Sequence, residues 1–219
     1  MNVSAWEVRA IRDGRKTQTR RVIKTSIQDW SEIRLGFFNP TKINRRGEEY
    51  AGRDVFGAYT DDGEWGLKCP FGQPGDLLWL REKFAKNTDT KGMGCIYYAA
   101  DETAKYVLAE DNGEGDWVET TTDVPKSKLW LPVRWRPSTQ MPRCASRDTL
   151  RIKSVRIERL QEISGPDCWA EGIESAGWDC TKWGSVTHCY RDLWNSTNGP
   201  DSWDANPFVW VIEHERVKE

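Results

Sequence analysis

The segment 149–160 constrains the fold most, because its apolar residues change face part-way along. They fall into two parity classes: Leu150 and Ile152, and then Val155 and Ile157. Side chains alternate across a β-strand, so a regular strand cannot direct both pairs into one core. A bulge or sharp coil near Lys153 and Ser154 reconciles the two halves. Such bends are common where a sheet closes into a barrel, so the segment predicts a small, strongly coiled sheet.

Capping and hydrophobic patterns predict the other elements. Ser4 and Gly14 mark the ends of a first helix, and Ser164 with Asp167 forms a capping box that opens a second helix, running to about Glu174. Apolar residues at helical spacing within 183–194 predict a third helix. Further strands are expected at 17–23, 77–80, 95–99, 129–136 and 207–214. The run 77–80 is apolar on both faces, which is typical of a central strand covered on both sides.

The order of these elements predicts an α+β fold in a single domain over 1–219. Two polar stretches, at about 25–72 and 85–128, are expected to be long insertions, the first with one hairpin. Regular strand–helix alternation is lacking, and so are a G-x-G-x-x-G motif and a Walker loop. We therefore expect no dinucleotide cofactor.

Composition narrows the class of protein. Charged residues make up 30% of the 219 residues, and no stretch approaches the roughly 18 consecutive apolar residues that a membrane span requires. The first residues show no secretory signal, so we expect a cytoplasmic protein. The six cysteines form no C-x-x-C pair, which predicts reduced, mostly buried thiols and no metal site. Thirteen Trp fit core packing, with a minority left for base stacking.

The net charge of −2 conceals a strong asymmetry. Residues 9–24 carry seven basic side chains and one Asp, and residues 134–159 carry eight basic side chains and two acids. Between them, residues 101–123 hold eight acids and a single Lys. We expect the two basic segments to share a face that attracts phosphates, with the acidic segment as an outward loop. The alternative is a solvated surface with internal ion pairs. Single strands or nucleosides fit this acidic chain better than duplex DNA.

The chemistry of the first basic segment centres on Lys16. His188 and His214 are the only histidines, and both are expected to be structural or solvent-facing. A Lys surrounded by cations can activate a nearby hydroxyl, and the hydroxyls near Lys16 are those of Thr17 and Thr19. Thr19 lies three positions after Lys16. In an extended strand the two side chains would point to opposite faces, so the chain has to bend after Gly14. Without that bend, Lys16 is a phosphate-contacting or solvated residue.

Three separated motifs carry a family resemblance: Ile11–Arg21 (IRDGRKTQTRR), Gly75–Glu82 (GDLLWLRE) and Ala170–Ile173 (AEGI). Together they resemble the ASCH domain, a member of the PUA-like β-barrels. The enlarged, phage-encoded branch is similar also in WRPS at 135–138, MPRCASR at 141–147 and SWDANP at 202–207. The resemblance implies a closed or partly closed barrel of five to six strands, flanked by helices. A phage-encoded protein of this kind would be found in the cytoplasm of the bacterial host.

The resemblance also implies a function. Small bacterial members remove the acetyl group from N4-acetylcytidine with a Lys, a Thr and a Glu. Transferred to this chain, Thr19 is the nucleophile, Lys16 its base, and Glu171 a proton shuttle or the group that orients Lys16. The substrate- or nucleic-acid-binding residues would be Arg15, Arg20, Arg21, Arg81, Arg143 and Arg147. Arg143 and Arg147 are phosphate contacts or internal ion pairs. The alternatives are a noncatalytic RNA-binding or phage–host interaction module, and a metal-independent ribonuclease.

Overall fold

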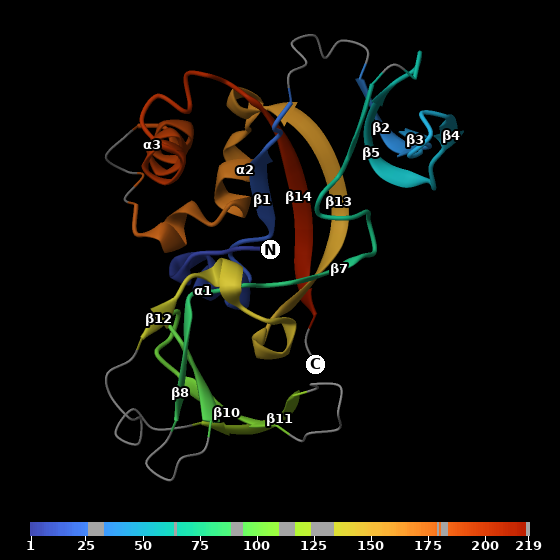
Figure 1. Ribbon diagram of the computed structural model, residues 1–219. Coiled ribbons are helices and arrows are strands. Elements are labelled where there is room, and N and C mark those ends of the chain that lie inside the picture. Colours follow the sequence, from blue (N-terminus) through green and yellow to red (C-terminus); the bar gives the residue numbers. More distant parts are fainter. Residues whose placement is uncertain are drawn as a thin grey trace.

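A curled, four-stranded antiparallel sheet forms the centre of the computed structural model (Figure 1). The structure describes residues 1–25, 33–63, 65–88, 94–109, 117–123, 134–178, 180 and 184–217. In order across the sheet, the strands are β1 (Gln18–Val22), β14 (Phe208–Val217), β13 (Thr149–Arg159) and β7 (Leu77–Trp79). The fold is α+β with mostly antiparallel sheets. A closed barrel is not confirmed, because within the described residues β1 and β7 are the two edges of this half-barrel.

The long strand β13 bends where its apolar parity changes. Its register against β14 shifts between Ile152 and Ser154, so one extra residue is inserted at that point. On either side of the shift, Ile152 and Val155 are both buried in the same hydrophobic cluster. The bulge expected near Lys153 and Ser154 is thus confirmed.

Both faces of the curled sheet are covered (Figure 1). The helices pack on one face, where Val209 and Val211 of β14 join their cluster. They are α2 (Gly165–Ala170) and α3 (Val186–Asn198), with short 3-10 helices at Leu160–Glu162 and Ile173–Ala176. On the other face, Trp210 and Ile212 pack with Ala58 of the first insertion. Because both faces are covered, the side chains on both faces of β14 are apolar.

The first insertion is richer in strands than the single expected hairpin. It contains a three-stranded sheet, in the order β2 (Ile33–Phe38), β5 (Val55–Thr60) and β6 (Gly66–Lys68), and a hairpin of β3 (Thr41–Ile43) and β4 (Glu49–Ala51). Both strands of the hairpin are exposed throughout. Strands that bury so little give no continuous apolar pattern, and therefore the sequence did not reveal them.

The second insertion belongs to a five-stranded sheet, which lies below the curled sheet in the view of Figure 1. In order across it, the strands are β11 (Trp117–Asp123), β10 (Ala104–Ala109), β9 (Gly94–Tyr98), β8 (Phe84–Thr88) and β12 (Trp135–Arg136). The strand expected at 95–99 corresponds to β9. Residues 129–133 of the strand expected at 129–136 lie outside the described residues. The loop that follows is ordered by 3-10 helices at Ser138–Gln140 and Arg143–Ala145, and it buries Met141.

Two expectations about these elements are wrong. The run 77–80 was expected to be a central strand, but β7 is an edge of its sheet and Leu77 is 55% exposed. A run of consecutive apolar residues is expected for a strand buried on both faces, but also for a strand that ends within the run. Here the strand ends at Trp79, and Leu80 packs in a hydrophobic cluster with Met1 and Val3. The acidic segment 101–123 is also no outward loop, because β10 and β11 lie within it and Asp101 binds Arg12 and Arg147.

The cysteines also depart from the expectation of reduced thiols. Cys180 and Cys189 form a disulfide, with their Cα atoms 5.4 Å apart. They are nine residues apart in the sequence, and the bond joins Cys180 to the first turn of α3. The other four cysteines are thiols: Cys69, Cys95 and Cys168 are buried, and Cys144 is exposed. Among the described residues, no helix combines the length and hydrophobicity of a membrane span.

Candidate functional site

The turn after the first helix brings Lys16 to Glu171. Helix α1 (Ala5–Arg12) begins with a capping box of Ser4 and Glu7. Gly14 then adopts a φ of +74°, and the backbone N–H of Lys16 returns to donate to the carbonyl of Ala10 at 3.0 Å. The bend expected at Gly14 is therefore present, and it places Lys16 beside the end of α2.

The backbones of the two segments are in contact at this point. Lys16 and Glu171 form an isolated antiparallel bridge, and the N–H of Thr17 donates to the carbonyl of Ala170 at 2.9 Å. Gly172 has a φ of +78°, and a Cβ at that position would lie 2.9 Å from the Cβ of Lys16. Only glycine combines this backbone conformation with so close an approach.

Lys16 and Glu171 form a buried ion pair. Their relative exposures are 2% and 4%. The ammonium of Lys16 donates to Glu171 Oε2 at 2.8 Å and to the Glu171 carbonyl at 3.0 Å. The other carboxylate oxygen, Oε1, accepts from Arg20 Nη1 at 3.2 Å. Glu171 thus bridges two buried cations, and it compensates part of the cost of removing them from water.

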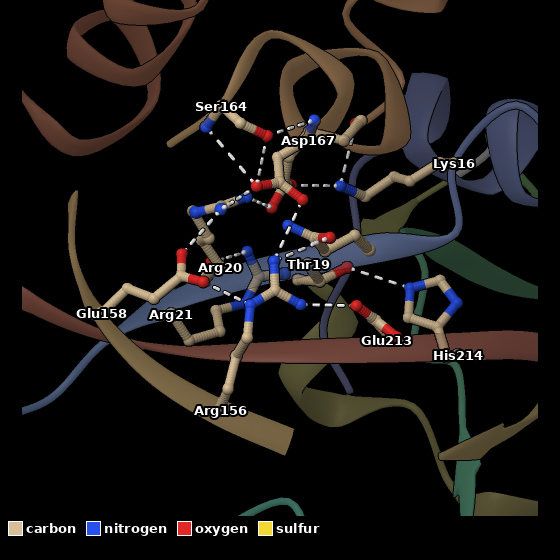
Figure 2. A network of polar contacts seen from close by, with 12 residues as sticks. Lys16, Thr19, Arg20, Arg21, Arg156, Glu158, Ser164, Asp167, Glu213 and His214 are labelled. Carbon is tan, nitrogen blue, oxygen red and sulfur yellow. Dashed lines mark hydrogen bonds and ion pairs between the residues drawn. The ribbon is translucent and has the colours of Figure 1, made fainter. Parts of the chain in front are cut away.

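The Thr19 hydroxyl has a different partner. Thr19 is fully buried, and its Oγ1 lies 3.1 Å from Nε2 of His214. Burial lowers the pKa of His214 to about 3, and the charges of Lys16 and Arg21 act in the same direction. The imidazole is therefore neutral at physiological pH. Figure 2 shows Thr19 pointing toward His214. The Lys16 ammonium instead reaches the end of α2, where it binds Glu171.

A pocket opens above the Lys16–Glu171 pair. It has a volume of about 120 Å³. Its residues come from α1, from the turn and strand that follow, from the end of α2 and from α3: Ser4, Trp6, Glu7, Lys16, Arg20, Arg21, Glu171, Tyr190, Leu193, Trp194, Thr197 and Asn198. The Lys16 ammonium lies 5.7 Å from the centroid of the Trp6 ring. Aromatic rings and an ion pair thus share one small hollow.

Within the described residues, Lys16 has one donor left for a ligand. An ammonium carries three N–H donors, and two of them bind Glu171. A second carboxylate oxygen, Glu7 Oε1, lies 3.9 Å away, beyond hydrogen-bond distance. Burial raises the pKa of Glu7, but the charges of Lys16 and Arg21 and the hydrogen bonds from Ser4 outweigh it, and the pKa is lowered overall. Glu7 is therefore ionised beside the ammonium.

The three N-terminal arginines of the predicted site lie at different depths. Arg20 is 1% exposed, at the base of the pocket, and its guanidinium also binds Glu158 and Asp167 (Figure 2). Arg21 is partly exposed and lines the pocket, where it lies 3.7 Å from Glu7. Arg15 is exposed and binds Asp13. Of the three, only Arg21 is placed to meet the solvent-exposed part of a ligand.

The other three predicted arginines do not line the pocket. The Arg147 side chain is 4% exposed and binds Glu82 and Asp101, so of its two interpretations the internal ion pair is the observed one. The guanidinium of Arg81 lies 5.1 Å from the centroid of the Trp79 ring. Arg143 is exposed on a 3-10 helix.

Sequence reasoning missed several residues of this site. The sequence pattern could have indicated that His214 is buried, because it lies on the same face of β14 as the buried residues Trp210 and Ile212. The sequence could also have indicated Glu7, because it stands at the N3 position of a capping box that begins at Ser4. The meeting of Trp6 with Trp194 in one pocket had no local signal, since it depends on how α3 packs against α1.

Comparisons of the chain with protein-family models, curated proteins and solved structures gave no match. Within the part of the chain that the structure describes, no group of three or more His, Cys, Asp or Glu is arranged to hold a metal ion.

Proposed function

We propose that this chain is an ASCH-type protein that binds a nucleoside, free or at an unpaired position of RNA, in the pocket above Lys16 and Glu171. The observation that carries the proposal is the buried Lys16 ammonium, which has one donor left among the described residues and faces a hollow bounded by Trp6 and Trp194. A base presents acceptors along its edge and a π-face on each side. The pocket offers a donor for the edge and indole rings for the face.

The size of the pocket favours a single base. Its volume is about 120 Å³. Sites for drug-sized ligands usually occupy about 300–1,000 Å³, so a whole nucleotide does not fit inside. The sugar and phosphate would remain outside, within reach of the partly exposed Arg21.

Titration with nucleosides tests the proposal. Cytidine, N4-acetylcytidine and uridine are added to the full chain, and binding is followed by tryptophan fluorescence and by calorimetry. We expect saturable binding that Lys16→Met weakens at least tenfold, because the free donor is lost. Arg15→Met, which removes an exposed cation of the same segment, serves as the matched control. Absence of binding to every nucleoside, or equal binding by Lys16→Met, would contradict the proposal.

Hydrolysis of N4-acetylcytidine is the second candidate function. It is favoured by the contact between Lys16 and Glu171, two of the three residues that the family resemblance implicates. In this reaction Lys16, as the neutral amine, takes the hydroxyl proton of Thr19 while Oγ1 attacks the acetyl carbonyl carbon. The C–N4 bond then breaks, and the same proton passes from Lys16 to N4 as cytidine leaves. Water then hydrolyses the acetyl-threonine ester. The Thr19 hydroxyl has to leave His214 and reach the pocket for this attack.

Release of cytidine from N4-acetylcytidine separates the two candidates. An enzyme loses cytidine release in both Lys16→Ala and Thr19→Ala, and keeps part of it in Thr19→Ser, which retains the hydroxyl. Nucleoside binding without release would exclude the reaction and leave a binding protein. Cleavage of an RNA strand in a chelating buffer would instead indicate a metal-independent ribonuclease.

A further inference from the structure

A second aromatic site lies on the five-stranded sheet, on elements that do not line the pocket. Trp135 of β12 is paired with Ala85 of β8, and Ala85 is paired with Tyr97 of β9. The three residues thus form one row across the sheet. Because the middle residue is small, the outer two rings meet above it: Trp135 and Tyr97 stack at 5.2 Å between centroids, with 26° between their planes.

The stacked pair is exposed on its outer side. Trp135 is 38% exposed, whereas Tyr97 and Ala85 are buried beneath it. A ring supported from below in this way keeps a fixed orientation, so it loses little conformational freedom when a ligand stacks on it.

The surroundings of Trp135 are basic. Arg134 and Arg136, its neighbours in the chain, are both exposed, and the Lys83 ammonium lies 5.6 Å from the centroid of the Trp135 ring. The sequence contains no acid between residues 134 and 147. β12, an edge strand of this sheet, therefore lies in a basic part of the chain.

We propose that Trp135 is a stacking platform for an unpaired base of a single-stranded nucleic acid, and that Arg134 and Arg136 bind the adjoining phosphates. An exposed aromatic ring at a basic edge of a sheet suits a single strand, because stacking is tolerant of sequence and cations along the edge can follow the backbone. The charge of this edge decides against a basic partner, because a basic partner would be repelled from it. A duplex is excluded as the main ligand because its bases are already stacked.

The Lys83 ammonium does not block the platform. An exposed cation–π contact increases an equilibrium constant by only about twofold to fivefold. Stacking of a base on an aromatic side chain is worth about fivefold to a hundredfold in affinity. A base therefore displaces the ammonium from the ring. The flexible Lys83 side chain can then turn to a phosphate.

Fluorescence anisotropy with labelled oligouridine of about 12 nucleotides, a length within the usual site sizes for single strands, tests the platform at low salt. For the full chain we expect Trp135→Ala to weaken binding about fivefold to a hundredfold and Trp135→Phe to retain most of it. Trp169→Ala, which removes another exposed Trp, on α2, is the matched control and should bind as the unaltered chain does. The double variant Arg134→Gln, Arg136→Gln should reduce the slope of log Kd against log salt by about 1.4, or roughly 0.7 per phosphate contact.

Three outcomes would overturn the platform. These are absence of binding to oligouridine at low salt, equal binding by Trp135→Ala and the unaltered chain, and equal loss of binding in Trp135→Ala and Trp169→Ala. Circular dichroism shows whether Trp135→Ala is folded, and Trp135→Phe provides the answer if it is not. Titration with free cytidine keeps this test separate from the pocket, because Trp135→Ala should leave that binding unchanged while Lys16→Met weakens it at least tenfold.

Discussion

Two buried cations of this molecule, Arg147 and Lys16, differ in how completely their donors are used. The guanidinium of Arg147 makes five hydrogen bonds, two to Glu82 and three to Asp101 and Thr103. A guanidinium has five N–H donors, so none is left. The ammonium of Lys16 uses two of its three donors on Glu171 and faces a pocket.

The pKa values around Arg147 reflect this saturation. Burial alone raises the pKa of the Asp101 carboxyl, but the hydrogen bonds from Arg147 and Thr103 outweigh it and lower the pKa to about 2. Burial lowers the pKa of Arg147, whereas the hydrogen bonds and charges of Glu82 and Asp101 raise it above its ordinary value overall. Arg147 and Asp101 are therefore both charged at neutral pH, and the donors of the guanidinium are all occupied by the protein itself.

The comparison shows that burial of a charge does not by itself identify a functional site. Both cations are nearly inaccessible, and both belong to segments that the sequence marks as basic. What distinguishes them is the remaining donor and the hollow beside it. A saturated cluster is expected to contribute mainly to stability, and an unsaturated one to contribute to binding as well.

The largest expected effect comes from breaking the saturated cluster. Arg147→Met leaves Glu82 buried without its cation, and removal of one partner of a buried pair typically costs about 3–5 kcal/mol. The free energy of unfolding, measured by urea denaturation, should fall by that amount, and nucleoside binding by the folded fraction should be unchanged. Arg15→Met is the control, because its exposed pair with Asp13 is worth about 0–1 kcal/mol. Equal losses in the two variants would contradict the distinction.

Breaking the unsaturated pair should cost less stability and more binding. In Lys16→Met the Glu171 carboxylate keeps its hydrogen bond from Arg20, so we expect a loss of about 1–3 kcal/mol, as for one unsatisfied buried group. Nucleoside affinity should fall at least tenfold. Urea denaturation and calorimetric titration of the same preparation measure both quantities. A stability loss as large as that of Arg147→Met, with binding intact, would show that Lys16 is purely structural.

Two glycines with similar backbone conformations sharpen the comparison further. Gly14 has a φ of +74°, and a Cβ there would have no atom within 4 Å, whereas Gly172 has a φ of +78° and a Cβ there would lie 2.9 Å from the Lys16 Cβ. Left-handed backbone costs a non-glycine residue roughly 1–2 kcal/mol, so each Ala variant should lose about that much stability. Gly172→Ala should in addition displace Lys16 and weaken nucleoside binding, which Gly14→Ala should not. Binding that is unaffected in both variants would mean that the position of Lys16 is not critical.

Local signals predicted most of the curled sheet and its flanking helices. The change of face in β13 predicted its bulge. The N-cap at Ser4 and the capping box at Ser164 predicted the starts of α1 and α2. The second helix was expected to run to about Glu174, but α2 ends at Ala170 because Gly172 turns left-handed and a 3-10 helix follows. In the insertions the sequence predicted one hairpin and the strands at 95–99 and 129–136, but not the sheets that they join. The β3–β4 hairpin is exposed throughout and therefore gave no apolar pattern.

The candidate site could be predicted only in part. The contact between Lys16 and Glu171 rested on the family resemblance and on the bend at Gly14, because 155 residues separate the two in the sequence. The partner of the Thr19 hydroxyl depended on the register of β1 against β14, which no local pattern specifies. Similarly, nothing near Arg147 in the sequence indicated that Glu82 would neutralise it.

The smallest expected effect concerns His214, which contacts Thr19 beneath the pocket and is held neutral. Burial lowers its pKa from 6.5 to about 3 in the folded protein. Between these values the unfolded chain binds a proton that the folded protein does not, so stability is present above pH 6.5 and is lost as the pH falls. Linkage gives a slope of about 1.4 kcal/mol per pH unit at most, and a loss of about 1 kcal/mol between pH 6 and pH 5.

Urea denaturation of the unaltered chain and of His214→Gln at pH 6 and pH 5 isolates this contribution. The carboxyl groups titrate mainly below pH 5, so their share of the slope is small in this window. The unaltered chain should become less stable by about 1 kcal/mol between the two pH values, and His214→Gln should not. His188→Gln, at an exposed position of α3, should behave as the unaltered chain does. If His214→Gln kept the full pH dependence, the imidazole would be charged beside Thr19, and it could then only donate to the hydroxyl, never accept its proton.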